Sequence, residues 1–226
     1  MVDVRLFIEY IHTQLLPQLV VESTHPHDPI VVRHIPEPWK LMGAGNYAVV
    51  VSHPDFADRV VKIYAPGRHG WEEEVEVYRR LGQHPAYAEC FHSDKDHRYL
   101  VLRRLYGVTL YDCFRRGIPI PEQVIFDIDE ALDYARNRGL RPHDVHGKNV
   151  MLNAKGRGLV VDVSDFLKHE PCRMWHDLKK AYYKIYLPYL YDKQIPIPDV
   201  LLNVVRKAYR IVRRIRSMFH RSHHVH

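Results

Sequence analysis

The stretch Arg141–Phe166 reads RPHDVHGKNVMLNAKGRGLVVDVSDF and combines three polar side chains with two short apolar runs. Asp144 stands in a loop, Asn149 follows five residues later, and Asp162 ends the second apolar run. The runs VML and LVV on either side of the turn residues 153–158 predict a β-hairpin. Such a hairpin would bring Asn149 and Asp162 together at one end, with Asp144 just before it.

This set of side chains suits one kind of chemistry. Two carboxylates and an amide oxygen are ligands that Mg²⁺ accepts, and it shares them with phosphate oxygens. Asp144 could then orient a hydroxyl group or take its proton, a role that fits phosphoryl transfer. A surface hairpin with unrelated polar residues is the alternative that this stretch alone leaves open.

Composition sets bounds on the kind of protein. The 226 residues allow one sizeable core or two small lobes around a cleft, and 46% hydrophobic with 27% charged residues is ordinary for a globular chain. Asp3 and Glu9 interrupt the first apolar stretch, so we expect no signal peptide. Cys90, Cys113 and Cys172 form no C-x-x-C pair, which favours a reducing cytoplasm over a disulfide scaffold or a zinc site.

A second informative stretch, LMGAGNYAVVV, begins at residue 41. It holds Gly43, Gly45 and, where a third glycine would complete G-x-G-x-x-G, Ala48. Glycines in a turn between strands let backbone N–H groups approach phosphate oxygens, although a plain hairpin turn would look the same. The strand VVKIY then carries Lys62, and no G-K-[ST] of a P-loop is present.

Together these stretches resemble the protein-kinase-like superfamily, whose pattern is H-R-D-x-x-x-x-N, a strand pair and D-F-G. The spacing from Asp144 to Asn149 is kept, but Pro-His stands for His-Arg and D-V-S stands for D-F-G at Asp162. His146 looks more like the H-x-D-x-H-x-x-N version of small-molecule and lipopolysaccharide kinases. Within this superfamily, the chain most resembles small atypical bacterial serine/threonine kinases with a truncated C-lobe.

The resemblance implies roles for the N-terminal half of the site. Lys62 matches the lysine that binds the α- and β-phosphates, and Glu74, in a helix predicted over 71–81, matches its partner. The remaining glutamates in that helix are the solvated alternatives: Glu72, Glu73 and Glu76.

The segment RRLYGVTLYDCF resembles the interlobe hinge, where a strand over 99–105 runs into a small helix. By that match Leu102 lines the back of an adenine pocket. Backbone groups near Arg103 to Leu105, including Arg104, would bind the adenine edge. Arg103 replaces the usual acidic hinge residue.

The implied ligands are ATP and Mg²⁺ or Mn²⁺. Gly43 and Gly45 would lie over the phosphates, Asn149 and Asp162 would hold the metal, and Asp144 would be catalytic together with Lys62 and Glu74.

The implied fold is α+β and two-lobed, with a small β-rich N-lobe and a mainly helical, minimal C-lobe. An apolar helix over 4–21, which Pro17 would end or kink, is expected to pack on the outside of the next lobe, and a connector follows it. An amphipathic helix over 121–138 leads into the catalytic stretch, and its expected buried stripe is Val124, Ile125, Ile128, Leu132 and Ala135. The expected divisions are 1–29, 30–105 and 106–226.

The last predicted helix, 200–219, combines an apolar face with many Arg and Lys residues. Its predicted apolar positions are Leu201, Val204, Val205, Ala208, Ile211, Val212, Ile215 and Met218. The favoured interpretation is a closing helix that packs its apolar face on the protein. An anionic membrane surface or nucleic acid is the alternative partner, in keeping with a net charge of +6, and nucleic acid is the weaker of the two. The tail HRSHHVH is expected to be disordered.

Three functions remain open from the sequence. The first is a serine/threonine protein kinase that transfers the γ-phosphoryl group of ATP to a hydroxyl. The second is a small-molecule or lipopolysaccharide-type kinase, which His146 and the absence of an A-P-E segment support. The third is a nucleotide-binding pseudokinase, which the altered residues near Asp144 and Asp162 allow.

Overall fold

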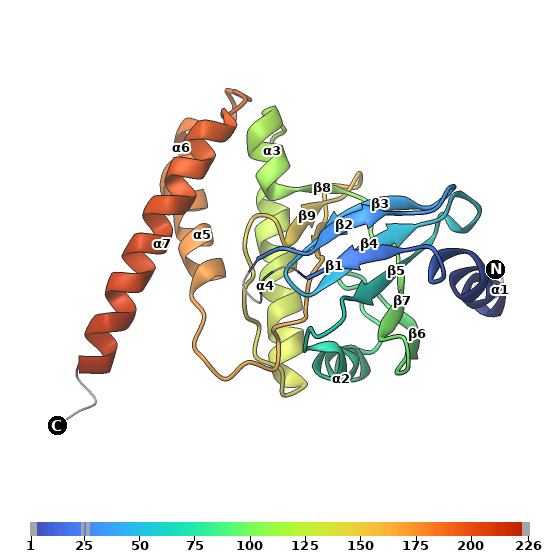
Figure 1. Ribbon diagram of the computed structural model, residues 1–226. Helices are drawn as coiled ribbons and strands as arrows, with labels where there is room; N and C mark the ends of the chain where they lie inside the picture. The colour runs from blue at the N-terminus through green and yellow to red at the C-terminus, as the bar shows by residue number, and fades with distance from the viewer. Residues whose placement is uncertain (1–3, 24, 26–27, 223–226) are drawn as a thin grey trace.

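The structure is a computed structural model that describes residues 4–23, 25 and 28–222, with side chains described as far as residue 211 (Figure 1). It is an α+β protein. Its strands are β1 Val20–Glu22, β2 Val31–His34, β3 Lys40–Ala44, β4 Ala48–Ser52, β5 Arg59–Tyr64, β6 Cys90–Asp94, β7 Tyr99–Arg103, β8 Val108–Thr109, β9 Val150–Leu152 and β10 Gly158–Val160. Its helices are α1 Val4–Tyr10, α2 Trp71–Leu81, α3 Leu110–Arg116, α4 Glu122–Asn137, α5 Met174–Ala181, α6 Leu187–Tyr189 and α7 Asp199–Ser222, with π-helical turns η1 Ile11–Leu15 and η3 Tyr182–Tyr186 and a 3₁₀ turn η2 Pro54–Phe56.

A five-stranded antiparallel sheet in the order β3-β4-β5-β7-β6 forms the N-terminal half of the molecule. Because side chains alternate along a strand, β4 and β5 send one apolar set to each face. One face packs against α1 and η1, whose Phe7, Ile11 and Leu15 are fully buried. Burial of each of these side chains contributes about 1.5–3 kcal/mol. The N-terminal helix therefore lies on the outside of the sheet, as the sequence predicts.

The opposite face of the sheet joins the main core. That core includes Val77 and Leu81 of α2 and the apolar stripe of α4. The predicted stripe of α4 is buried throughout: Val124, Ile125, Ile128, Leu132 and Ala135. The β9–β10 hairpin lies on α4, and a Cβ at Gly158 would stand 2.9 Å from the carbonyl oxygen of Val124. The hairpin prediction is confirmed, with its second strand starting one residue earlier than expected.

Two predicted segments are wrong. Residues 84–93 were expected to be a connector, but Cys90–Asp94 forms β6 and pairs with β7 at the edge of the sheet. The helix predicted over 4–21 ends at Leu15, before Pro17, as expected of that proline, but the residues after it are not helical, because Val20–Glu22 pairs with β2.

The C-terminal helix forms, but the interpretation favoured for it is wrong over its described side chains. Its predicted apolar positions Leu201, Val204, Val205, Ala208 and Ile211 are all exposed. The predicted positions 212, 215 and 218 and the His-rich tail lie outside the described side chains. Among the described residues no helix combines the length and the apolar character that a membrane crossing requires.

Candidate active site

Lys62 and Glu74 form an ion pair between the sheet and α2. Nζ of Lys62 lies 2.8 Å from Oε1 of Glu74, and their side chains are 12% and 0% exposed. Of the four glutamates in α2, Glu74 is the one that contacts Lys62. Glu72 lies 3.9 Å from Arg98, and Glu76 accepts hydrogen bonds from arginines of its own helix. The geometry is that of a charge-assisted hydrogen bond held inside the protein.

Asp162 meets this pair from the other half of the chain. Its Oδ1 lies 3.4 Å from Nζ of Lys62 and accepts a hydrogen bond of 3.1 Å from the backbone N–H of Ser164. Just before it, Val161 donates its backbone N–H to the carbonyl oxygen of Asn149 at 2.9 Å. The hairpin thus brings Asn149 and Asp162 to the same end, where Asp162 contacts Lys62 of β5.

The pKa shifts follow from one ammonium facing two carboxylates. Burial opposes the charge on Lys62, but Asp162 and Glu74 outweigh it and raise the pKa of the lysine. Burial also raises the pKa of Glu74, which Lys62 only partly counteracts. Burial acts in the same sense on Asp162, but Lys62 and the N–H of Ser164 overcome it and lower its pKa. With all three groups ionised, the cluster carries an excess of one negative charge.

Asp144 lies in the loop before the hairpin and is half-exposed. Its φ of +58° is left-handed, a conformation that Asp tolerates better than most residues. Oδ2 of Asp144 lies 3.8 Å from Nε2 of His146. Burial raises the pKa of Asp144, while the neighbouring His146 acts in the opposite sense. A carboxylate with a raised pKa is better suited to accept a proton.

The residues present fit a divalent cation. Asn149 donates its side-chain N–H to the carbonyl oxygen of Asp144 at 3.0 Å, which leaves its amide oxygen free to act as a ligand. Asp162 adds a carboxylate, so the donor set is made of oxygen atoms, as Mg²⁺ prefers. The excess negative charge of the Lys62 cluster also favours a cation at this place.

The expected nucleotide-binding residues lie around the same sheet. In the sheet, Val50 pairs with Lys62 and Ala48 pairs with Tyr64. The turn between β3 and β4, residues 45–47, therefore lies just beyond Lys62 at the end of the sheet near Tyr64. A side chain at Gly43 would meet nothing within 4 Å, so the space over the turn is open. Among the described residues, the hydrogen bonds of Gly45 and of the Lys62 cluster do not join the two.

The expected hinge follows β7. Leu102 is buried and pairs with Val60. Arg103 donates its backbone N–H to the carbonyl oxygen of Glu89, and Arg104 donates to that of Asp58, both at 2.8 Å. Adenine recognition at Arg103 and Arg104 would therefore use their carbonyl oxygens or side chains rather than these N–H groups.

Sequence reasoning missed several residues that hold the site. The Tyr64 hydroxyl donates to Oε2 of Glu74 and is also 3.2 Å from the carbonyl oxygen of Gly70, so it positions the glutamate. The signal was available, because Tyr64 follows Lys62 by two residues and therefore shares its face of the strand.

A second missed group lies behind Asp144. Asp165 approaches His143 at 3.8 Å and Lys168 at 2.8 Å, and the thiol of Cys172 accepts the N–H of Asp144 at 3.4 Å. These contacts join the loop around Asp144 to residues 165–172, and no spacing in the sequence indicates them.

A cavity of about 290 Å³ lies between α4 and α5. Pro142 and Val145 bring the catalytic loop to its wall, whereas Lys62 and Asp162 take no part in it. Its polar wall includes Asp129, which accepts hydrogen bonds from Trp175 and Lys179 at 2.7 Å. The cavity is thus separate from the Lys62 cluster.

The chain is similar to known kinases over most of its length. A Bacillus subtilis (strain 168) protein named "Putative serine/threonine-protein kinase YrzF" is 29% identical over 167 residues, which cover 73% of this chain and 77% of that protein. "Dual serine/threonine and tyrosine protein kinase" of Pimephales promelas is 26% identical over 186 residues, covering 74% of this chain and 20% of that protein. "Ribosomal protein S6 kinase alpha-2" of Mus musculus is 27% identical over 135 residues, covering 55% and 18%.

The chain thus spans about a fifth of the length of the two animal relatives. No family model matches it. Its similarity to kinases nevertheless extends through the segments that supply Lys62, Glu74 and Asp162, and the structure brings these three residues together. The chain is homologous to members of the protein-kinase-like superfamily.

Proposed function

We propose that this protein is an ATP-dependent phosphotransferase, and that it acts as a serine/threonine protein kinase. The observation that carries the proposal is the convergence of Lys62, Glu74 and Asp162. Phosphoryl transfer in protein kinases requires both the lysine–glutamate pair and the metal-binding aspartate in place. In the proposed fold a small β-rich lobe, residues 30–105, and a mainly helical lobe, 106–226, enclose the nucleotide. Residues 1–29 brace the small lobe from outside.

Each residue has a defined part in this mechanism. Lys62, held by Glu74, binds the α- and β-phosphates of ATP, and the turn of Gly43 and Gly45 covers them. Leu102 and the backbone near Arg104 contact the adenine.

On the C-terminal side of the site, Asn149 and Asp162 would hold Mg²⁺ or Mn²⁺. The bound cation offsets the negative charge that builds up on the transferred phosphoryl group. Asp144 orients the acceptor hydroxyl and receives its proton as the oxygen forms a bond to the γ-phosphorus and ADP leaves.

A small-molecule acceptor is the second candidate, and one observation favours it. Only residues 163–173 separate Asp162 from α5, and contacts from Asp165 and Cys172 hold this segment against the catalytic loop. A short, fixed segment offers little surface to an extended peptide. His146, close to Asp144, fits the same reading.

The test is transfer of labelled γ-phosphate from Mg-ATP to the protein itself and to a generic basic protein. We expect the wild type to label protein and Asp162→Asn to lose on the order of 10³-fold in rate or more, because a metal carboxylate is gone. Asp133→Asn, an exposed aspartate on α4, is the matched control and should label normally.

The outcomes separate the candidates. Mg-dependent ATP binding without labelled protein would favour a small-molecule acceptor or a pseudokinase. Near-normal turnover by Asp162→Asn would remove Asp162 from the metal site. Absence of ATP binding would contradict the proposed activity as a whole.

A further inference from the structure

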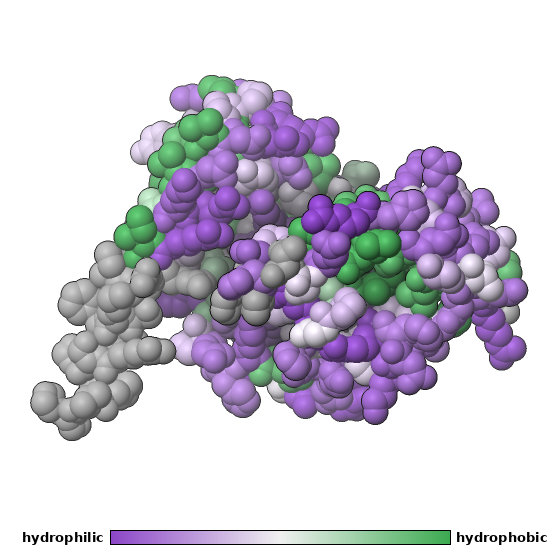
Figure 2. All heavy atoms as spheres, in the orientation of Figure 1, coloured by the Kyte–Doolittle hydropathy of each residue, from purple (hydrophilic) through white to green (hydrophobic). Residues whose placement is uncertain are grey.

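The helix α7 exposes an apolar stripe that the described part of the protein does not cover. Its most exposed members are spaced so that they share one side of the helix, since neighbours at i+4 and i+7 lie above one another. They are Val200 at 75% exposed, Leu201 at 53%, Val204 at 55%, Val205 at 58% and Ile211 at 61%. Figure 2 shows hydrophobic side chains along the outer edge of this helix.

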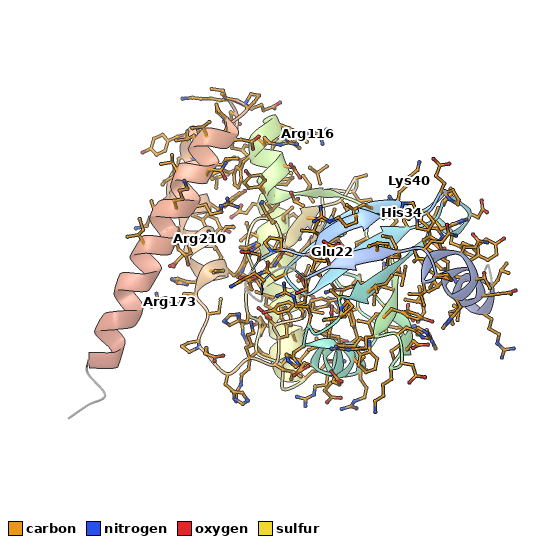
Figure 3. All side chains as sticks on the ribbon, viewed as in Figure 1. Glu22, His34, Lys40, Arg116, Arg173 and Arg210 are labelled. Atoms are coloured by element: carbon orange, nitrogen blue, oxygen red, sulfur yellow. The ribbon has the colours of Figure 1, made fainter. Side chains whose placement is uncertain are left out.

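The helix is held to the protein by other residues. The hydroxyl of Tyr209 donates to Oδ2 of Asp177 in α5 at 3.1 Å, and Asp199 lies 3.1 Å from the hydroxyl of Tyr111 in α3. Figure 3 labels Arg210 on α7, beside α5. Polar contacts therefore attach the helix and leave its apolar stripe facing outward.

The net charge of the helix is strongly positive. Within Asp199–Ser222 the sequence has seven Arg or Lys residues and one acidic residue, Asp199, which stands at the first position. Arg206, Lys207 and Arg210 are exposed. The sequence of the helix continues with four more basic residues: Arg213, Arg214, Arg216 and Arg221.

These two properties select among the partners that could cover the stripe. A second copy would bring two strongly positive helices face to face, which like-charge repulsion opposes. A nucleic acid would match the charge but offers no apolar surface for the stripe. An anionic bilayer face matches both, because acyl chains accept the apolar side and headgroups attract Arg and Lys.

We propose that α7 lies in the plane of an anionic membrane surface and docks the protein there. Its 24 residues make a helix about 36 Å long, enough for an in-plane contact along the stripe. The contacts through Tyr209 and Asp199 would keep the rest of the protein close to the bilayer, so a phosphoryl acceptor near the membrane would be within reach.

Co-sedimentation of the full chain with vesicles tests the proposal. We expect binding to phosphatidylcholine vesicles that contain phosphatidylserine, weak binding to phosphatidylcholine alone, and a loss of binding as salt rises. Replacing Arg206, Lys207 and Arg210 by Ala should weaken binding on the order of 100-fold at low salt, since each charge near the surface contributes about 1 kcal/mol.

The apolar stripe is tested by the double variant Val204→Asp with Val205→Asp, which should abolish binding. The matched control is Ile185→Asp with Tyr189→Asp. It makes the same charge change at two apolar side chains, 57% and 64% exposed, that lie outside α7. Circular dichroism of all variants identifies any that fail to fold, and a folded control that binds normally supports the proposal.

Three results would overturn it: no vesicle binding by a folded wild type, equal loss in both double variants, or a stable dimer in light scattering that the Val204/Val205 variant dissociates. Binding to single-stranded RNA but not to vesicles would point to nucleic acid instead. None of these measurements uses ATP, so their failure is distinct from a failure of phosphoryl transfer.

Discussion

The Lys62 cluster and the loop around Asp144 belong to the same candidate site but are built differently. Glu74 is buried and Lys62 is only 12% exposed, and each has its partners within the protein at hydrogen-bond distance. Asp144 is half-exposed, has a left-handed backbone, and its Oδ2 lies 3.8 Å from Nε2 of His146, beyond hydrogen-bond distance. Folding alone therefore fixes the side that would bind phosphate. We expect the side that would meet the acceptor to gain further contacts from a bound substrate.

The largest expected effect separates these two sides. Asp144→Asn should lower phosphoryl transfer by about 10³-fold, because the base that positions the hydroxyl is lost, and should leave ATP affinity little changed. Single-turnover transfer and equilibrium ATP binding measure the two quantities. A loss of ATP affinity as large as the loss of rate would show that Asp144 and the Lys62 cluster do not act separately.

Glu74→Gln should have a smaller effect, and this effect should fall on ATP affinity, which Asp144→Asn leaves little changed. Weakening a charge-assisted hydrogen bond by about 1.5–3 kcal/mol corresponds to a tenfold to 100-fold weaker ATP affinity. Glu73→Gln, an exposed neighbour on the same helix, is the matched control and should bind normally. Unchanged ATP binding by a folded Glu74→Gln would mean that Lys62 needs only Asp162 to stay in place.

The smallest expected effect concerns the support of the hairpin. Asp127 of α4 accepts hydrogen bonds from Arg157 at 2.7 Å and from the N–H of Gly158 at 2.8 Å, and so ties β10 to the helix. Arg157 is more than half exposed, so water screens part of the attraction. Asp127→Asn should lower the free energy of unfolding by about 1–3 kcal/mol.

The sign of its pH dependence follows from the pKa. Burial would raise the pKa of Asp127, but Arg157 and Gly158 hold it below the ordinary value of 3.8. Its stabilisation is therefore present above pH 3.8 and is lost as pH falls through the folded-state pKa. Denaturant unfolding at neutral and acidic pH measures this. A difference between wild type and Asp127→Asn that stays constant into acid would contradict the assignment.

Two amphipathic helices show how far sequence patterns reach. Both α4 and α7 have the period of a surface helix, and both form. The stripe of α4 is buried against the hairpin and the main core, whereas that of α7 is exposed. Periodicity predicts that a helix has an apolar side, but it carries no information about what that side meets.

For the candidate site, too, the sequence predicts some residues and misses others. Lys62, Glu74 and Asp162 could be named because the stretches that carry them resemble the motifs of the protein-kinase-like superfamily. The strand β6 was missed because CFHSD shows no alternation, and it forms because β7 offers it an unpaired edge. The contacts of Asp165 and Cys172 depend on chain segments that meet only in three dimensions.

Gly156 and Gly158 stand two residues apart at the hairpin and restrict sequence drift for different reasons. At Gly156 the φ of +74° is the constraint and the surroundings are open, so Asn or Asp is a tolerable replacement. At Gly158 the constraint is space, because any side chain would meet the carbonyl oxygen of Val124 and the side chain of Ile128. Random mutagenesis under selection for folding should thus admit a few residues at the first position and retain glycine at the second.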